Sequence, residues 1–192
     1  MALPRERETG HYLQMSTGSV PVLLVSGPVG VGKTSVAAEI FDQLADRGIK
    51  HAVIDLDGLG VCWPFGEGDR FNERMTMRNH AAVWANYAEA GIGRAVIARV
   101  VESRSQLAAF RTAIPGAEII VCQLAAGVAV LRERVARRET GSSYESLVRR
   151  SVELADSLPR CDAADFSVST DGRGVADVAM EALIRAGWLP GG

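Results

Sequence analysis

Short apolar runs alternate along the chain with longer stretches whose apolar residues recur every three or four positions. The first run, Val20–Val25, is continuous, which is typical of a strand buried on both faces of a sheet. In the next stretch Val36, Ile40 and Leu44 are four apart, so the spacing predicts a helix over residues 34–47 with one apolar stripe. Alternation of this kind predicts an α/β domain built on a parallel sheet.

The same alternation continues to the end of the chain and predicts five strands in all. The four further strands are expected at residues 52–56, 95–101, 118–124 and 165–169. Helical spacing separates them, at Met77 to Ala88, Leu107 to Ile114, Val128 to Val135 and Leu147 to Leu158, and a last helix is expected from Val175 to Leu183. Right-handed connections between parallel strands place such helices on both faces of the sheet.

A complete phosphate-binding motif lies between the first expected strand and the first expected helix. Its residues are Gly27, Pro28, Val29, Gly30, Val31, Gly32, Lys33 and Thr34, which fit the pattern G-x-x-x-x-G-K-[ST]. Glycines let backbone N–H groups approach phosphate oxygens, and the helix that follows directs its positive end to the same place. Lys33 is expected to neutralise the β- and γ-phosphates and Thr34 to ligate Mg²⁺, with Ser35 in the same nucleotide-binding turn.

Two acidic residues, Asp55 and Asp57, stand at the expected end of the second strand. Alternate residues of a strand point to one side, and open α/β sheets bind ligands beyond the carboxyl ends of their strands. Asp57 is therefore a candidate to orient or deprotonate an attacking hydroxyl, and Asp55 a candidate to reach Mg²⁺. The alternative interpretation makes both residues solvated turn formers before Gly58. The third expected strand contains no Asp, so the metal's carboxylate would come either from Asp55 and Asp57 or from Glu102 just beyond that strand.

Three arginines are candidates for contacts with phosphate or substrate. Arg134 and Arg138 are four apart on an expected helix and so share a face, from which they could stabilise charge on a transferring phosphoryl group. Arginines near a helix C-terminus also arise simply because they interact favourably with the helix dipole. Arg99 is expected midway along the third strand, where a buried cation needs a charged partner or a ligand, and this makes it a candidate for the substrate crevice.

These motifs resemble the small-molecule P-loop kinases, the group that includes gluconate, shikimate and adenylylsulfate kinases and chloramphenicol phosphotransferase. The resemblance rests on the loop at residues 27–34, on Val53–Gly58, and on the arginine-bearing helix Leu131–Glu139. It implies a P-loop NTPase fold with a small helical lid at about residues 134–158, and ATP with Mg²⁺ as cofactors. It also implies a substrate-binding segment at residues 58–79, whose candidates Arg70, Arg74 and Arg78 would act together with Asp57 and Arg99.

Composition narrows the partners that the chain is expected to have. The 192 residues contain 21 Lys and Arg against 23 Asp and Glu, a net charge of −2, so neither a nucleic acid nor a membrane surface is an expected partner. Three widely spaced cysteines favour a reducing compartment and hence a cytoplasmic location. Residues 1–18 are expected to be poorly ordered, and residues 19–192 to form one domain, as a monomer or homodimer.

The hypothesis that accommodates most of these features is an ATP-dependent kinase. It would transfer the γ-phosphoryl group to a hydroxyl of a small metabolite or antibiotic, which would be its acceptor substrate. The alternative from another class is a nucleotide-dependent switch or accessory ATPase that acts on a protein partner. A polynucleotide 5′-hydroxyl kinase would need a basic channel, which the net charge does not indicate.

Overall fold

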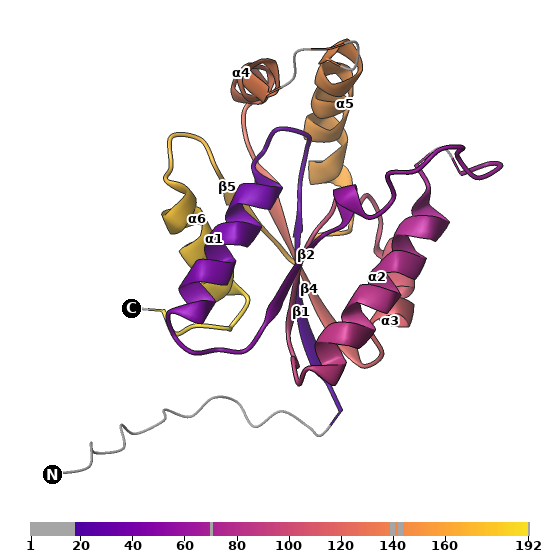
Figure 1. The fold of residues 1–192 in the computed structure, drawn as a ribbon. Coiled ribbons are helices and arrows are strands. Elements are labelled where there is room, and N and C mark those ends of the chain that lie inside the picture. Colours follow the sequence, from indigo (N-terminus) through magenta and orange to yellow (C-terminus); the bar gives the residue numbers. More distant parts are fainter. Residues whose placement is uncertain (1–17, 70, 139–140, 142–143, 192) are drawn as a thin grey trace, which may run out of the picture.

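A single sheet of five parallel strands runs through the centre of the protein (Figure 1). The order of the strands in the sheet is β2-β3-β1-β4-β5. The computed structural model describes residues 18–69, 71–138, 141 and 144–191. The strands are β1 (Val20–Ser26), β2 (Ala52–Asp55), β3 (Ala95–Ala98), β4 (Ala117–Ala125) and β5 (Phe166–Ser169). The five-stranded parallel sheet expected from the sequence is therefore confirmed.

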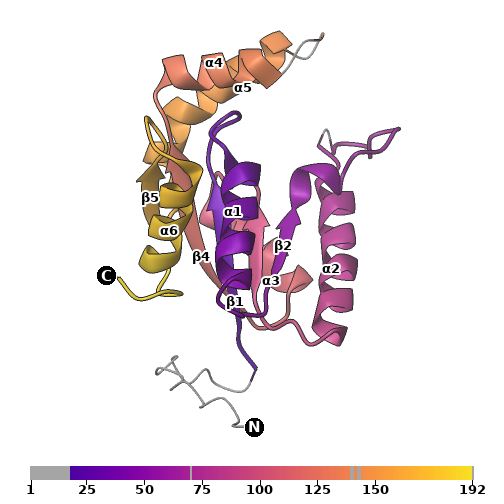
Figure 2. The same ribbon diagram turned by 60° about the vertical axis from the view of Figure 1, so that its left-hand side comes forward.

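Helices cover both faces of this sheet. Helices α1 (Lys33–Ala45) and α6 (Val175–Arg185) pack on one face, and α2 (Glu73–Glu89) and α3 (Leu107–Ala113) on the other (Figure 2). Successive residues of a strand point to opposite faces, so β1 supplies both halves of the core. Leu23 packs with the α1 and α6 side chains, whereas Leu24 packs with Trp84 and Phe110 from α2 and α3.

Two further helices lie beyond the carboxyl ends of the strands instead of on a face of the sheet. These are α4 (Val128–Arg138) and α5 (Tyr144–Ser157), which stand at the edge where β1 ends (Figure 1). They span most of the region for which the sequence predicts a lid. Short 3₁₀ turns at Leu56–Gly58, Arg104–Gln106 and Leu158–Arg160 complete the described structure.

The structure corrects two boundaries. The third strand ends at Ala98, not at residue 101, so Arg99 lies just beyond the strand and not midway along it. Its neighbour β1 turns into the phosphate loop after Ser26, and Val101 N–H therefore donates to the Ser26 hydroxyl (2.9 Å) instead of to strand backbone. Helix α2 begins at Glu73, earlier than the apolar spacing indicates.

The start of α2 is fixed by Asp69, which lies in the segment 58–79 that was expected to bind substrate. The Asp69 carboxylate accepts hydrogen bonds from the N–H groups of Glu73 (2.7 Å) and Arg74 (3.0 Å), which satisfies the helix terminus. These bonds hold the pKa of Asp69 below its ordinary value. The expectation for the N-terminal segment concerns residues 1–17, which lie outside the described residues, as does Arg70. No described helix is long and apolar enough to cross a bilayer.

Candidate active site

The phosphate loop between β1 and α1 has a backbone that only glycine accommodates. Gly27, Gly30 and Gly32 have φ angles of 140°, 81° and 104°, in the left-handed region. A Cβ at Gly27 would lie 2.5 Å from the Leu124 carbonyl oxygen, and one at Gly30 would lie 2.8 Å from Val135 Cγ2. No side chain caps the start of α1, so its first N–H groups remain free to face a phosphate group.

Lys33 is buried inside this loop, with only 8% of its surface exposed. Its ammonium group donates to the carbonyl oxygens of Gly27 (3.0 Å) and Pro28 (3.1 Å). Burial lowers the pKa of Lys33 to about 8, against the opposing attraction of Asp57 and Asp55. A pKa this low means that part of the Lys33 population is neutral near pH 8. The negative charge of a bound phosphate group would favour the protonated form.

Thr34 and Asp55, the two residues expected to hold Mg²⁺, contact each other directly. The Thr34 hydroxyl donates to Asp55 Oδ2 at 2.6 Å, and Asp55 Oδ1 accepts from the N–H of Asp57 at 3.0 Å. Among the described residues, no group of three or more His, Cys, Asp or Glu side chains is arranged so that it could hold a metal ion. The donor set of one hydroxyl and one carboxylate fits Mg²⁺, which keeps several waters and relies on substrate phosphates, rather than a metal held in an all-protein cage.

Arg99 links two carboxylates from different elements beside the phosphate loop. Its guanidinium donates to Asp57 Oδ1 at 3.0 Å and forms a second ion pair with Glu73 at the start of α2. The Arg99 side chain is 17% exposed, so the expectation that it needs a charged partner is met twice over. Glu73 lies in the segment 58–79 that was expected to bind substrate, but its pairing with Arg99 was not predicted from the sequence.

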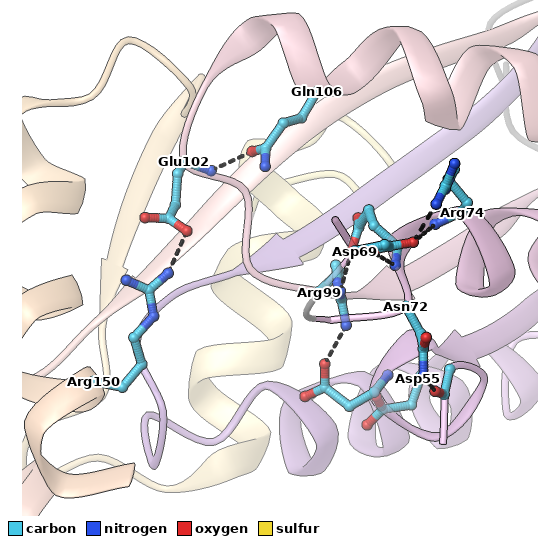
Figure 3. A network of polar contacts seen from close by, with 11 residues as sticks. Asp55, Asp69, Asn72, Arg74, Arg99, Glu102, Gln106 and Arg150 are labelled. Atoms are coloured by element: carbon cyan, nitrogen blue, oxygen red, sulfur yellow. Dashed lines mark hydrogen bonds and ion pairs between the residues drawn. The ribbon is translucent and has the colours of Figure 1, made fainter. Parts of the chain in front are cut away.

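A second ion pair joins the segment after β3 to α5. Glu102 pairs with Arg150, and the Glu102 N–H donates to Gln106 Oε1 at 2.7 Å (Figure 3). Nearby, the Ser151 hydroxyl donates to the Val29 carbonyl in the phosphate loop at 2.7 Å. Helix α5 is thus tied both to the loop and to the strand edge. Sequence reasoning missed Arg150, although its position between Leu147 and Leu154 on the apolar stripe was a signal that it faces inward.

The two candidate arginines of α4 occupy different surroundings. The Arg134 guanidinium donates to the Val31 carbonyl (3.1 Å), to the Thr170 hydroxyl (2.9 Å) and to the Thr170 carbonyl (3.1 Å). It therefore fastens the phosphate loop to the end of β5. Arg138 lines the same cleft, and its charge contributes to the lowered pKa of Lys33.

A cleft of about 650 Å³ brings most of these groups together at the carboxyl edge of the sheet. Its lining includes Val29, Gly30, Val31, Gly32, Lys33, Thr34, Ser35, Asp57, Phe71, Glu73, Arg99, Glu102, Arg134, Arg138, Leu147, Arg150, Leu154 and Arg173. Two expected substrate residues lie elsewhere. Arg74 is exposed on α2 and donates to the Glu67 carbonyl at 2.9 Å, whereas Arg78 is exposed further along the helix, and neither lines the cleft.

No protein-family model matches the sequence, and no curated protein matches it. Solved structures do match, at low sequence identity. The tunicamycin resistance protein of Deinococcus radiodurans aligns with a TM-score of 0.61 and 20% identity over 88% of this chain and 97% of that one. A gluconokinase from Sinorhizobium meliloti gives 0.58 and 24% over 88% and 91%.

A third match is the Mycobacterium tuberculosis APS kinase solved with AMPPNP and APS, with a TM-score of 0.56 and 19% identity over 88% of this chain and 98% of that one. All three alignments cover nearly the whole of both chains. The similarity expected from the phosphate loop and the strand-end carboxylates thus extends to the entire architecture. The chain has the α/β P-loop fold that is found in small-molecule kinases.

Proposed function

We propose that the protein is a kinase that transfers the γ-phosphoryl group of ATP to a hydroxyl of a small molecule. The observation that carries this proposal is that one cleft contains both the phosphate loop and the Asp57 carboxylate. Solved structures of the same fold include a gluconokinase and an APS kinase with bound AMPPNP and APS, which supports both the nucleotide and the small acceptor.

One group of residues in the cleft would bind the phosphates of ATP and the Mg²⁺ ion. Backbone N–H groups of the loop, together with Lys33, would hold the β- and γ-phosphates, and Arg138 would face the transferring group. Thr34 and Asp55 would hold Mg²⁺, directly or through water. When bound, Mg²⁺ would neutralise charge on the phosphate oxygens. Arg134 would act indirectly, because its donors already connect Val31 to Thr170.

Asp57 would orient the acceptor hydroxyl and accept its proton. The contact with Arg99 uses Oδ1, and among the described residues Oδ2 has no hydrogen-bond partner, so this oxygen can receive the acceptor's O–H. Arg99 fixes the carboxylate in place, and Glu73 balances the Arg99 charge. Helices α4 and α5 would act as the lid over this site, excluding water that would otherwise consume ATP.

The test is to incubate the protein with γ-labelled ATP, Mg²⁺ and fractions of a small-molecule extract. Wild type is compared with Lys33→Ala, Asp57→Asn and the control Asp162→Asn, which changes a carboxylate that is 97% exposed and outside the cleft. Label in a soluble compound from wild type and the control, lost in the two site variants, is the expected result. Label only in inorganic phosphate, at equal rates in wild type and Asp57→Asn, would instead favour the nucleotide-dependent switch or accessory ATPase.

A further inference from the structure

In the half of the cleft that would receive the acceptor, every cationic side chain among the described residues already forms an ion pair with a carboxylate. None is therefore available to pair with an anionic substrate. We define this acceptor end by Asp57, Glu73, Arg99, Glu102 and Arg150, all of which line the cleft. Three carboxylates thus face two guanidinium groups, which gives a net charge of −1. Arg99 already pairs with Asp57 and Glu73, and Arg150 with Glu102. A carboxylate or phosphate on the acceptor would have to displace one of these partners.

Most of the other charged groups of the cleft belong to its nucleotide end. Lys33 lies within the phosphate loop, and Arg134 is held by Val31 and Thr170. Arg173 pairs with Glu181 on α6. Arg138 also lines the cleft and acts electrostatically on Lys33, as Asp57 and Arg99 do. Lys33, Arg134 and Arg173 therefore place positive charge at the end of the cleft where ATP would bind.

Exposed apolar side chains are concentrated in the segment just before α2, and one of them, Phe71, reaches the cleft. Phe71 lines the cleft and is 66% exposed. The segment that leads to it exposes Val61 (83%), Trp63 (83%) and Phe65 (54%), and the rings of Trp63 and Phe65 contact each other with centroids 5.5 Å apart. Exposed apolar groups gathered in this way on a soluble domain commonly mark a binding site. We call these four side chains the aromatic segment.

Hydrogen bonds from one side chain hold the loop backbone that carries the aromatic segment. The buried Asn72 side chain donates to the carbonyls of Gly60 (3.0 Å) and Cys62 (3.1 Å) and accepts from the Gly66 N–H (3.2 Å). Gly60 packs so closely on α2 that a Cβ there would lie 2.2 Å from Thr76 Oγ1. The aromatic rings are thus presented on a fixed loop, which lowers the entropy that a ligand must overcome to bind them.

We propose that the acceptor is an uncharged or positively charged alcohol that carries an apolar or aromatic group. The inference rests on the proposed kinase function. The apolar group packs against Phe71 and Trp63, while the hydroxyl reaches Asp57 at the acceptor end. The hydroxyl oxygen forms a bond to the γ-phosphorus, the bond from that phosphorus to the β–γ bridging oxygen breaks, ADP leaves with the bonding pair, and the hydroxyl proton passes to Asp57 Oδ2.

The test uses three aryl diols of one shape: 1-phenylethane-1,2-diol and its para-aminomethyl and para-carboxy derivatives, with gluconate as a compact anionic acceptor. Trp63 is the exposed tryptophan, since Trp84 and Trp188 are 5% and 7% exposed, so its fluorescence reports binding. The full chain, loaded with Mg²⁺ and AMPPNP, is titrated with each compound, and turnover is followed with γ-labelled ATP. We expect the uncharged and ammonium diols to bind about tenfold more tightly than the carboxylate.

Variants separate the aromatic segment from the rest of the site. Phe71→Ala and Trp63→Ala are expected to raise KM for the aryl diols about tenfold. The control Tyr87→Ala removes an exposed ring near the other end of α2, outside the cleft, and is expected to change neither this KM nor basal ATP hydrolysis. For Trp63→Ala, which removes the fluorophore, binding is followed by calorimetry.

The outcomes distinguish this inference from the proposed function. Preference for gluconate or the carboxylate diol, no binding of any aryl diol, or a Trp63→Ala effect only on self-association or lipid-vesicle binding overturns the acceptor class. The kinase function survives each of these results if the extract still contains a phosphorylated product. Failure of transfer to every compound, with nucleotide binding intact, overturns the function itself.

Discussion

We expect nucleotide binding to be coupled to protonation of Lys33. The free protein buries this lysine without a phosphate group nearby to stabilise its positive charge. The ammonium group has two carbonyl acceptors, Gly27 and Pro28, and burial lowers its pKa to about 8. At that pKa, about half of the Lys33 side chains are neutral at pH 8 and about nine in ten at pH 9. A bound phosphate group favours the charged form and raises the pKa again.

The magnitude follows from these populations. Binding is expected to take up about 0.5 proton per nucleotide at pH 8 and about 0.9 at pH 9, and affinity is expected to fall about fivefold between the two. Folding responds with the opposite sign, because folding lowers the pKa of Lys33 whereas nucleotide binding raises it. Since the folded pKa lies below the ordinary value of 10.5, the cost of burying the charged lysine is fully present below pH 8 and disappears as the pH rises to 10.5.

Titration calorimetry with Mg²⁺ and ADP, repeated in buffers of different ionisation enthalpy, measures the proton uptake directly. ADP is suitable because it is not consumed and its phosphates are fully ionised in this range. Lys33→Arg is the matched control, since its guanidinium stays charged and therefore removes the pH-dependent uptake. A wild-type uptake that stays near zero from pH 7 to 9 would refute the reasoning, because it would mean that the buried ammonium is already fully charged in the free protein.

Three further predictions concern the fold around the site. Burial lowers the pKa of His80 to about 4, and neither ring nitrogen has a hydrogen-bond partner among the described residues, so the unfolded chain alone takes up a proton below pH 6.5. Stability is therefore lost as the pH falls, and wild type should lose about 2 kcal/mol more than His80→Leu between pH 7 and pH 5 in urea unfolding. Asn72→Ala should speed hydrogen exchange around Gly66 and cost about 2 kcal/mol, since the loop loses three backbone hydrogen bonds to the buried Asn72 amide; unchanged exchange would contradict this. Gly27→Ala should abolish ADP binding and cost about 2 kcal/mol, whereas Gly58→Ala, which meets open space, should have little effect on either measurement.

Much of the architecture was already determined by the order of apolar residues. A continuous run such as Val20–Val25 can be buried only at the centre of a sheet, and the four-residue spacing of Val36, Ile40 and Leu44 provides one apolar stripe. The phosphate loop was equally predictable, because its chemistry depends on consecutive residues. The glycines, Lys33 and Thr34 act through the backbone turn that they themselves form, so no distant contact is needed to identify them.

Pairings between distant segments were decided only by the tertiary structure. Arg99 was predicted on a strand, but β1 turns away after Ser26, and the arginine instead bridges Asp57 and Glu73 from two other elements. The Glu102–Arg150 pair likewise joins residues 48 positions apart. Arg74 and Arg78 are exposed on α2 and do not line the cleft. Their role in substrate binding therefore stays a prediction from the sequence.

The physical reason for this division is the range of the interactions. Periodicity and turn chemistry depend on neighbours within a few residues, so the sequence by itself determined the strands, the helices and the phosphate loop. The charge balance of the acceptor end depends on which carboxylate folds against which guanidinium, and no local pattern encodes that choice. Only the packing of α2 and α5 against the ends of the strands decided it.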